Sequence, residues 1–140
     1  MTVIRVHGTP APQGSKVRTR FGMREASALV APWREAIVSE VLRQGLQEQF
    51  LSGPLMFRAT FWHKRLSSHY GMRKGQPYLK DPAPTFVATT PDHDKVLRST
   101  FDGMTQSGLI ADDKFIVVIH SQQRYSDTGF TGADIEIGPM

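Results

Sequence analysis

The chain of 140 residues contains no cysteine, and this absence removes several kinds of chemistry at once. Without thiols there is no disulfide, no thiolate ligand for zinc and no cysteine nucleophile. The chain also has no apolar run near the roughly 18 to 20 residues that a transmembrane helix needs. Its first residues, MTVIRVHGTPAP, lack the basic and then apolar layout of a signal peptide. We therefore expect a cytoplasmic protein with no membrane partner.

Aspartate is missing from the first 80 residues, although eight aspartates follow in the remainder. Residues 1–80 hold 13 Lys and Arg against 4 Glu, a balance of +9. Residues 81–140 hold 4 Lys and Arg against 9 acids, a balance of −5. This separation suggests a polyanion held by one region and a cation held by the other. Chance variation along a short chain is the alternative, and the distribution alone does not decide between them.

The length fits one domain, residues 1–140, and the 39% of hydrophobic residues can form its core. Apolar and polar residues alternate along 2–8, 54–64 and 133–138, which predicts three strands. A fourth strand is predicted at 114–125, where the β-branched run favours a central place in the sheet.

Two helices are predicted between these strands. Pro32 opens the first, with Glu35 in its first turn, as the helix dipole prefers. Its apolar stripe is Trp33, Ile37, Val41, Leu42 and Leu46. The second carries Val96, Leu97, Phe101 and Met104 and stops at Gly108. The order β-α-β-loop-α-β-β predicts an α+β fold, a mixed β-sheet with two helices packed on it.

Two segments are basic, and one of them, residues 65–84, lacks helical and strand periodicity. Residues 9–22 are punctuated by proline and glycine, which predicts a loop or short ribbon, and residues 65–84 read as a long mobile loop. Cations on or beside both segments are candidate contacts for DNA phosphates, with Tyr70 and Tyr78 able to stack on unpaired bases. These cations are Lys16, Arg18, Arg20, Lys64, Arg65, Arg73 and Lys74. A merely solvated basic surface is the alternative.

The acidic segment TTPDHDKVLRSTFDGM, residues 89–104, is the strongest candidate for a site. If Asp92 to Asp94 is extended, both carboxylates project to one side, with Cα atoms roughly 6 to 7 Å apart. Such a pair suits Mg²⁺, which binds through one or two carboxylates together with substrate phosphate. Arg98 lies one helical turn beyond Asp94 and can hold a phosphate. A helix N-cap explains one aspartate but does not require two.

Two further acids, Asp112 and Asp113, follow the second helix directly before the strand at 114–125. A helix over 95–107 is about 20 Å long, so Asp113 reaches the first pair only if residues 108–113 run back along that helix. Otherwise the third carboxylate must come from a partner subunit. Adjacent acids in a turn are also commonly just solvated.

The stretch PDHDKVLRSTFDGMTQSGLIADDKFIV, residues 91–117, resembles the signature of the RusA family of Holliday-junction resolvases. That signature is D-x-D-[N/K]-x-x-[K/R]-x-x-x-D-x-[L/M]-x-x-x-G-x-x-x-D-D-x-x-[V/I]. TPAPQGSKVR, APWREAI and SSHYG resemble further parts of phage-type members.

The resemblance implies a Mg²⁺-dependent, homodimeric endonuclease that resolves four-way DNA junctions in recombination and repair, with Mn²⁺ as a substitute. Asp92, Asp94 and Asp113 match the family's three essential acids, and Arg98 stands where a basic catalytic residue, often lysine, is found. Asp112 is expected to support the site or cap a loop, and Lys95 to offset phosphate charge. His93 replaces a residue that is more often hydrophobic, and we expect it not to bind metal. A bacterial cell, with a phage or prophage gene, is the implied setting.

Three alternatives are left open. A less selective nuclease for flaps or other branched DNA differs only in substrate range. A non-catalytic DNA-binding protein of the same fold is a second alternative, although it gains nothing from carboxylates near phosphates. A plain α+β interaction module is the third. The segment PQGSK lacks the rest of the G-x-x-x-x-G-K-[ST] pattern, so we expect no nucleotide cofactor.

Overall fold

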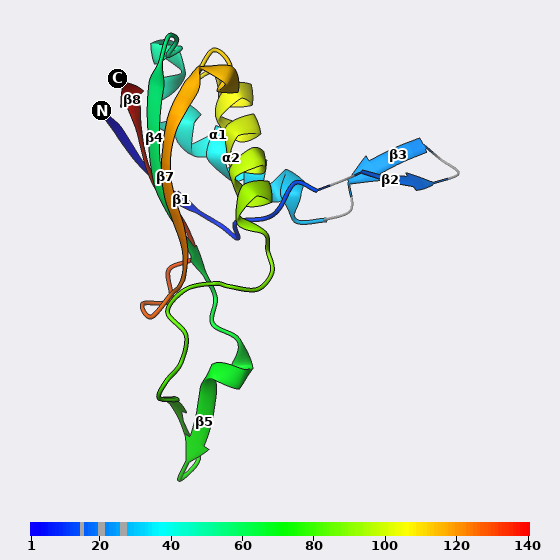
Figure 1. The fold of residues 1–140 in the computed structure, drawn as a ribbon, viewed down its shortest axis with the longest axis vertical. Helices are drawn as coiled ribbons and strands as arrows, with labels where there is room; N and C mark the ends of the chain where they lie inside the picture. The colour runs from blue at the N-terminus through cyan, green and yellow to red at the C-terminus, as the bar shows by residue number, and fades with distance from the viewer. Residues whose placement is uncertain (15, 20–21, 26–27) are drawn as a thin grey trace.

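The structure is a computed structural model that describes residues 1–14, 16–19, 22–25 and 28–140, with only the backbone at 16–19 and 22–25. A four-stranded sheet with the order β1-β8-β4-β7 is covered on one face by helices α1 and α2 (Figure 1). The strands are β1 (Thr2–His7), β4 (Leu55–His63), β7 (Ile116–Tyr125) and β8 (Gly132–Pro139). β8 pairs antiparallel with β1 and β4, whereas β7 is parallel to β4. The predicted α+β fold with a mixed sheet is therefore confirmed.

The core lies between the sheet and the helices. The alternation of β4 buries Leu55, Phe57, Ala59 and Phe61 on the helix side, as predicted. The edge of the Phe101 ring packs on Phe57, with centroids 5.0 Å apart. Each large apolar side chain buried here stabilises the fold by about 1.5–3 kcal/mol, and this burial holds α2 on the sheet.

Helix α1 (Val30–Arg43) begins two residues before Pro32, and a short 3₁₀ turn, Leu46–Gln49, follows it. Proline fits within the first turn because no N–H there has an intrahelical partner. The earlier start moves Glu35 out of the first turn, so that prediction was wrong. The predicted stripe is buried at Trp33, Ile37 and Val41, whereas the side chain of Leu42 is half exposed.

Helix α2 (His93–Ser107) ends at Gly108, whose φ of 85° is the left-handed conformation that glycine adopts without strain. The predicted stop is confirmed. Gly103 lies where α2 crosses α1, and a Cβ atom there would be 3.1 Å from Cδ1 of Ile37. No helix in the described part of the chain is long and apolar enough to cross a bilayer.

β7 is an edge strand, so the prediction of a central strand was wrong. An edge strand has a neighbouring strand on one side only, which leaves part of its apolar surface in solvent. Val117 and Ile119 are accordingly 59% and 44% exposed. Within the described residues, the outer edge of β7 is covered only at the C-terminal end, where Val87 N–H donates to the Gln123 carbonyl and Tyr125 N–H donates to the Thr85 carbonyl. A β-branched run reports strand propensity but not position in the sheet.

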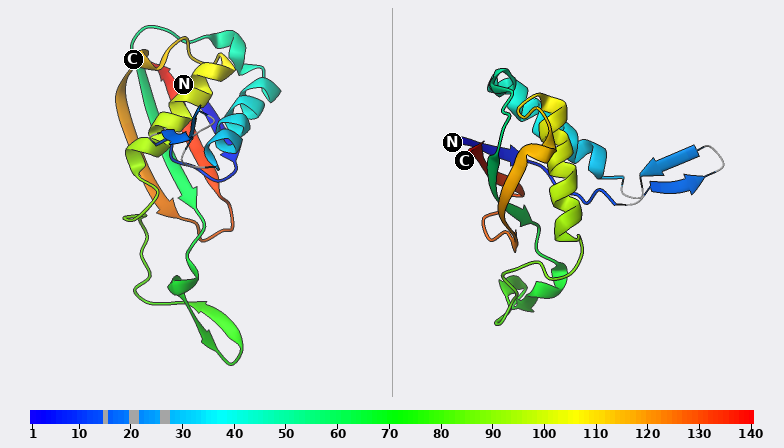
Figure 2. Two further views of the ribbon diagram at one scale, coloured as in Figure 1. Left: turned by 90° about the vertical axis from the view of Figure 1, so that its right-hand side faces the viewer. Right: turned by 45° about the horizontal axis from the view of Figure 1, so that its top comes forward.

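Two hairpins project from this body in different directions (Figures 1 and 2). The predicted basic ribbon is β2 (Lys16–Thr19) paired with β3 (Gly22–Glu25); Arg20 lies outside the described residues. The segment predicted as an irregular loop contains a 3₁₀ turn (Ser67–His69) and a second hairpin, β5 (Tyr70–Arg73) with β6 (Gln76–Leu79). Almost every residue of this hairpin is exposed, so no burial imposes the two-residue period that reveals strands in a sequence.

Candidate active site

The acidic turn is where α2 begins. Asp92 is its N-cap, with extended backbone at φ −63° and ψ 132°, and Asp94 lies in the first turn. The expected extended conformation therefore holds for Asp92 but not for His93 and Asp94. Both aspartates are exposed while His93 between them is half-buried, so the two carboxylates stand at the surface on either side of an inward-facing residue.

Capping does not occupy the Asp92 carboxylate. Asp92 stands at the N-cap, yet its side chain accepts no hydrogen bond from the backbone of the first turn. Its Oδ2 instead lies 3.2 Å from Nζ of Lys95, and its side chain is 55% exposed. An aspartate kept only as a cap is expected to bond the N–H groups of the helix start. The Asp92 carboxylate thus remains open to a cation.

Hydrogen bonds from the sheet hold this turn from behind. Gln123 on β7 donates from Nε2 to the carbonyl oxygen of Pro91 at 2.9 Å, and its Oε1 lies 2.9 Å from Nε2 of His63. His93 contacts Oγ of Ser121 through Nε2 at 2.8 Å. Burial lowers the pKa of both His63 and His93, so each is held as a neutral hydrogen-bonding group at neutral pH.

Basic residues lie on the same end of α2. Lys95 and Arg98 occupy its first turns, and the side chain of Arg98 is exposed. The loop after β1 runs along the helix, because Gln13 N–H donates to the Lys95 carbonyl at 3.0 Å and Ser99 Oγ donates to that of Ala11 at 2.6 Å. This loop leads directly into β2, the strand that carries Lys16 and Arg18.

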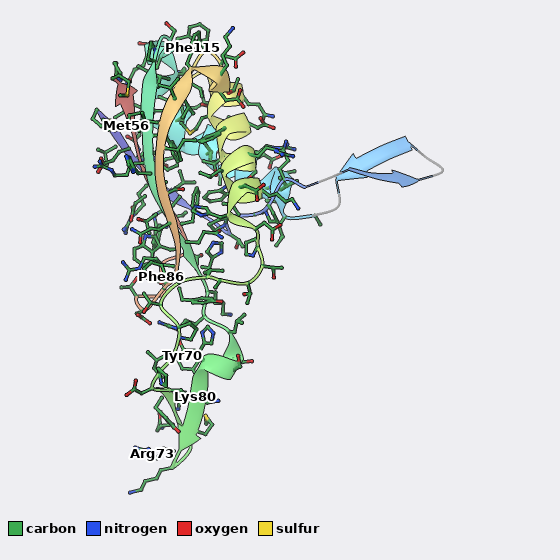
Figure 3. The ribbon with its side chains drawn as sticks, viewed as in Figure 1. Met56, Tyr70, Arg73, Lys80, Phe86 and Phe115 are labelled. Carbon is green, nitrogen blue, oxygen red and sulfur yellow. The ribbon has the colours of Figure 1, made fainter. Side chains whose placement is uncertain are left out.

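Asp112 and Asp113 lie at the opposite end of α2, which is 15 residues or about 22 Å long. The loop after the helix does not run back: Leu51 exchanges backbone hydrogen bonds with Leu109 and Ala111. Asp113 opens a 3₁₀ turn (Asp113–Phe115), and Phe115 is labelled at the far end in Figure 3. Among the described residues, no group of three or more metal-binding side chains forms within one chain.

The two adjacent acids differ in their surroundings. Asp112 caps the 3₁₀ turn by accepting a hydrogen bond from Lys114 N–H at 2.9 Å, which lowers the pKa of its carboxyl group. Partial desolvation raises the pKa of Asp113, and the neighbouring Asp112 and Asp102 add to the rise. Of the two carboxylates, the ionised form of Asp113 would therefore be stabilised more by a nearby positive charge.

Arg65 does not present its charge to DNA, so its prediction as a contact needs correction. Its side chain is 4% exposed, its Nε lies 2.7 Å from Oδ1 of Asp127, and its Nη1 donates to the Pro84 carbonyl at 2.7 Å. The other candidate cations of this region, Lys64, Arg73 and Lys74, have exposed side chains, as does the neighbouring Lys80.

Some residues that position the acidic turn and α2 could not be identified from the sequence. Gln123 lies in an ordinary strand sequence that gives no hint of its contact with Pro91. Asp102 belongs to the motif, but the sequence assigned no role to it. It accepts a hydrogen bond from Gln13 Nε2 at 2.5 Å, and Gln13 Oε1 in turn accepts one from Arg34 at 2.8 Å. Its fixed place in the motif was the only available signal.

Among curated proteins, none matches this chain at a significant level. The family model described as endodeoxyribonuclease RusA matches residues 5–138, almost the whole of the 140 residues. The match includes the acidic turn, the far acids and both hairpins. The chain therefore belongs to the RusA family of endodeoxyribonucleases, whose activity is the resolution of Holliday junctions.

Proposed function

We propose that this protein is a Mg²⁺-dependent endodeoxyribonuclease that cuts four-way DNA junctions at paired positions and acts as a homodimer. The observation that carries the proposal is the pair of exposed carboxylates, Asp92 and Asp94, at the start of α2. The Asp92 carboxylate makes no capping hydrogen bond and lies 3.2 Å from Lys95 Nζ, and Arg98 follows Asp94 by one helical turn. Membership of the RusA family supports branched DNA as the substrate.

The residues present fit Mg²⁺, with Mn²⁺ as a substitute. Carboxylate oxygens at the surface are the ligands that this hard cation takes, usually one or two per site together with water and phosphate. Asp92 and Asp94 would hold it from one chain. When bound, the ion polarises the scissile phosphate and activates water for attack. Arg98 and Lys95 offset the charge of the phosphate, and the start of α2 contributes its positive dipole end.

A second copy of the chain supplies the third acid in this proposal. The open edge of β7 exposes Val117 and Ile119, and an exposed apolar edge favours pairing with another strand. A two-fold axis near Val117, in the uncovered part of β7, would pair this edge with itself in antiparallel register. That operation reverses the strand direction, so the partner's Asp113 arrives beside Ser121, which contacts His93. The site would then hold three acids.

The decisive experiment is a cleavage assay on a synthetic four-way junction, with linear duplex and flap substrates as controls, each with and without Mg²⁺. Paired symmetric cuts in the junction alone, only with the metal, are the expected result. Equal cutting of flaps would indicate a less selective branched-DNA nuclease. Tight junction binding without cleavage in Mg²⁺ or Mn²⁺ would overturn the catalytic proposal in favour of a DNA-binding protein.

A further inference from the structure

Residues 64–85 form an arm that leaves β4 and returns to the edge of β7. Its base is fixed to the body: Arg65 bonds Asp127 and the Pro84 carbonyl, and the edge of the His69 ring packs on Tyr125, with centroids 4.6 Å apart. Its outer part is the β5–β6 hairpin, which extends away from the sheet in every view (Figures 1 and 2). A hairpin held only at its base is suited to reach a partner.

The two faces of this hairpin differ. Tyr70 pairs with Leu79 and Met72 pairs with Pro77, so these four residues share one apolar face, here called the apolar strip. The strip lies in solvent: Tyr70, Met72 and Leu79 are 40%, 68% and 43% exposed. Contiguous exposed apolar residues mark interaction sites, and a two-stranded hairpin is at best marginally stable by itself.

The opposite face carries a fixed aromatic platform. Tyr78 pairs with Gly71, and its ring covers that glycine so closely that an added Cβ atom would meet the ring at 2.6 Å. The Arg73 guanidinium lies 4.9 Å from the centroid of the same ring, a cation–π contact. Gly71 thus allows Tyr78 to lie across the hairpin, where Arg73 holds it.

The charge of the arm selects an anionic partner. Residues 64–85 contain five Lys and Arg, of which Arg65 is paired with Asp127, against one acid, Asp81. Tyr70, Arg73 and Lys80 are spread along the hairpin in Figure 3. A second copy of this chain would bring the same cations against themselves if the strips paired. A nucleic acid supplies phosphates for the cations and flat base faces for the apolar strip.

The arm is also joined to the acidic turn. Its return leg passes through Phe86 and Val87 to Pro91, a span of at most about 20 Å. Val87 N–H donates to the Gln123 carbonyl at 3.0 Å, and the Gln123 side chain holds the Pro91 carbonyl. The position of the hairpin relative to Asp92 is therefore set through a short, hydrogen-bonded segment.

We propose that the arm enters the branch point of the DNA substrate, where the apolar strip packs on bases that have lost a stacking neighbour and the cations bind the flanking phosphates. This inference rests on the proposed function and deepens it, because it names the feature of branched DNA that the protein recognises. Linear duplex offers no open base faces to the strip, so the arm contributes to binding only at branches.

The test measures 2-aminopurine fluorescence in a four-way junction without divalent metal, with the fluorescent base either at the branch point or within a duplex arm. Wild-type protein is expected to raise the signal at the branch point alone. The double variant Met72→Ser/Leu79→Ser is expected to lose that rise and to bind the junction about tenfold or more weakly, with unchanged binding to linear duplex. Leu42→Ser is the matched control, since Leu42 is an apolar residue of α1 that is 50% exposed.

The outcomes separate the two proposals. Wild-type affinity and fluorescence in the double variant would overturn the arm proposal, even if the wild-type protein cleaves junctions. A change of the double variant from dimer to monomer in analytical ultracentrifugation would also overturn it and assign the strip to a second copy. Absence of Mg²⁺-dependent junction cleavage by the wild-type protein would instead overturn the proposed function.

Discussion

Gln123 on β7 donates a hydrogen bond to the carbonyl oxygen of Pro91, the residue that precedes Asp92, at 2.9 Å. The same side chain lies 2.9 Å from Nε2 of buried His63, and its backbone carbonyl accepts from Val87 N–H. One residue of an edge strand therefore ties the sheet to the entrance of the acidic turn and to the end of the arm. This tie holds the backbone that leads into Asp92.

Replacement of Gln123 by leucine is expected to impair the site more than it impairs DNA binding. The change leaves the Pro91 carbonyl and His63 without a partner, which costs about 1–3 kcal/mol of stability. Cleavage should slow about tenfold, and a higher Mg²⁺ concentration should be needed for half-maximal rate. The control is Gln122→Leu, which changes an exposed neighbour whose amide donates to Thr60 Oγ1 at 3.3 Å. Equal metal dependence in both variants would contradict a positioning role.

Asp94→Asn is expected to abolish cleavage while the protein stays folded and binds junction DNA. Asp94 is exposed in the first turn of α2, so the loss of its charge removes a proposed metal ligand without opening a cavity. Loss of several kcal/mol of transition-state stabilisation lowers the cleavage rate by about a thousandfold or more. Gel-shift binding and junction cleavage measured on the same preparation test this, and an active variant would refute the assigned mechanism.

Mixing two inactive variants tests whether the site is shared between subunits. In a heterodimer of Asp94→Asn with Asp113→Asn, a shared site places both changes in one site and leaves the other intact. Random exchange should then restore about a quarter of the wild-type sites, seen as nicks in a single strand of each junction. If Asp113 acts within its own chain, every site contains one change and the mixture stays inactive. Each variant alone serves as the blank.

Arg65→Met is expected to loosen the arm without disturbing the sheet. The guanidinium is nearly fully buried and binds both Asp127 and the Pro84 carbonyl, so its loss should cost about 1–3 kcal/mol. Limited trypsin digestion should cut faster after Arg73, Lys74 and Lys80. Arg58→Met is the control. The Arg58 side chain is 55% exposed and lies 3.6 Å from Glu136, and such a surface pair contributes under about 1 kcal/mol to stability. Equal digestion rates in the two variants would count against an anchoring role.

The stability of the protein is expected to fall as the pH drops below about 6.5, in part because of His63. Burial lowers the pKa of His63 from its ordinary value of 6.5, so the unfolded chain binds more protons in the window between the folded-state pKa and 6.5. Stability from this group is fully present above 6.5 and is lost as the pH falls through that window. Urea unfolding of wild type and His63→Asn across this range should show a shallower pH dependence in the variant. Parallel curves would contradict the assignment.

The secondary structure followed from local patterns wherever burial is one-sided. The alternation of β4 and the stop of α2 at Gly108 were predictable because a half-buried strand and a left-handed helix end each impose a residue choice on the sequence. The β5–β6 hairpin was not predictable, since both of its faces are exposed and its residues carry no period. The start of α1 was displaced by two residues because proline is tolerated throughout a first helical turn.

The acidic motif, the absence of thiol chemistry and the separation of basic from acidic residues can all be found in the sequence alone, because they depend on residue types and short spacings. Contacts between distant segments set the rest. The pairing of Leu51 with residues 109–111 keeps Asp113 at the far end of α2, the sheet order leaves Val117 and Ile119 at an open edge, and Asp127 withdraws Arg65 from the surface. Each of these depends on which residues the chain brings together, and no local pattern encodes that choice.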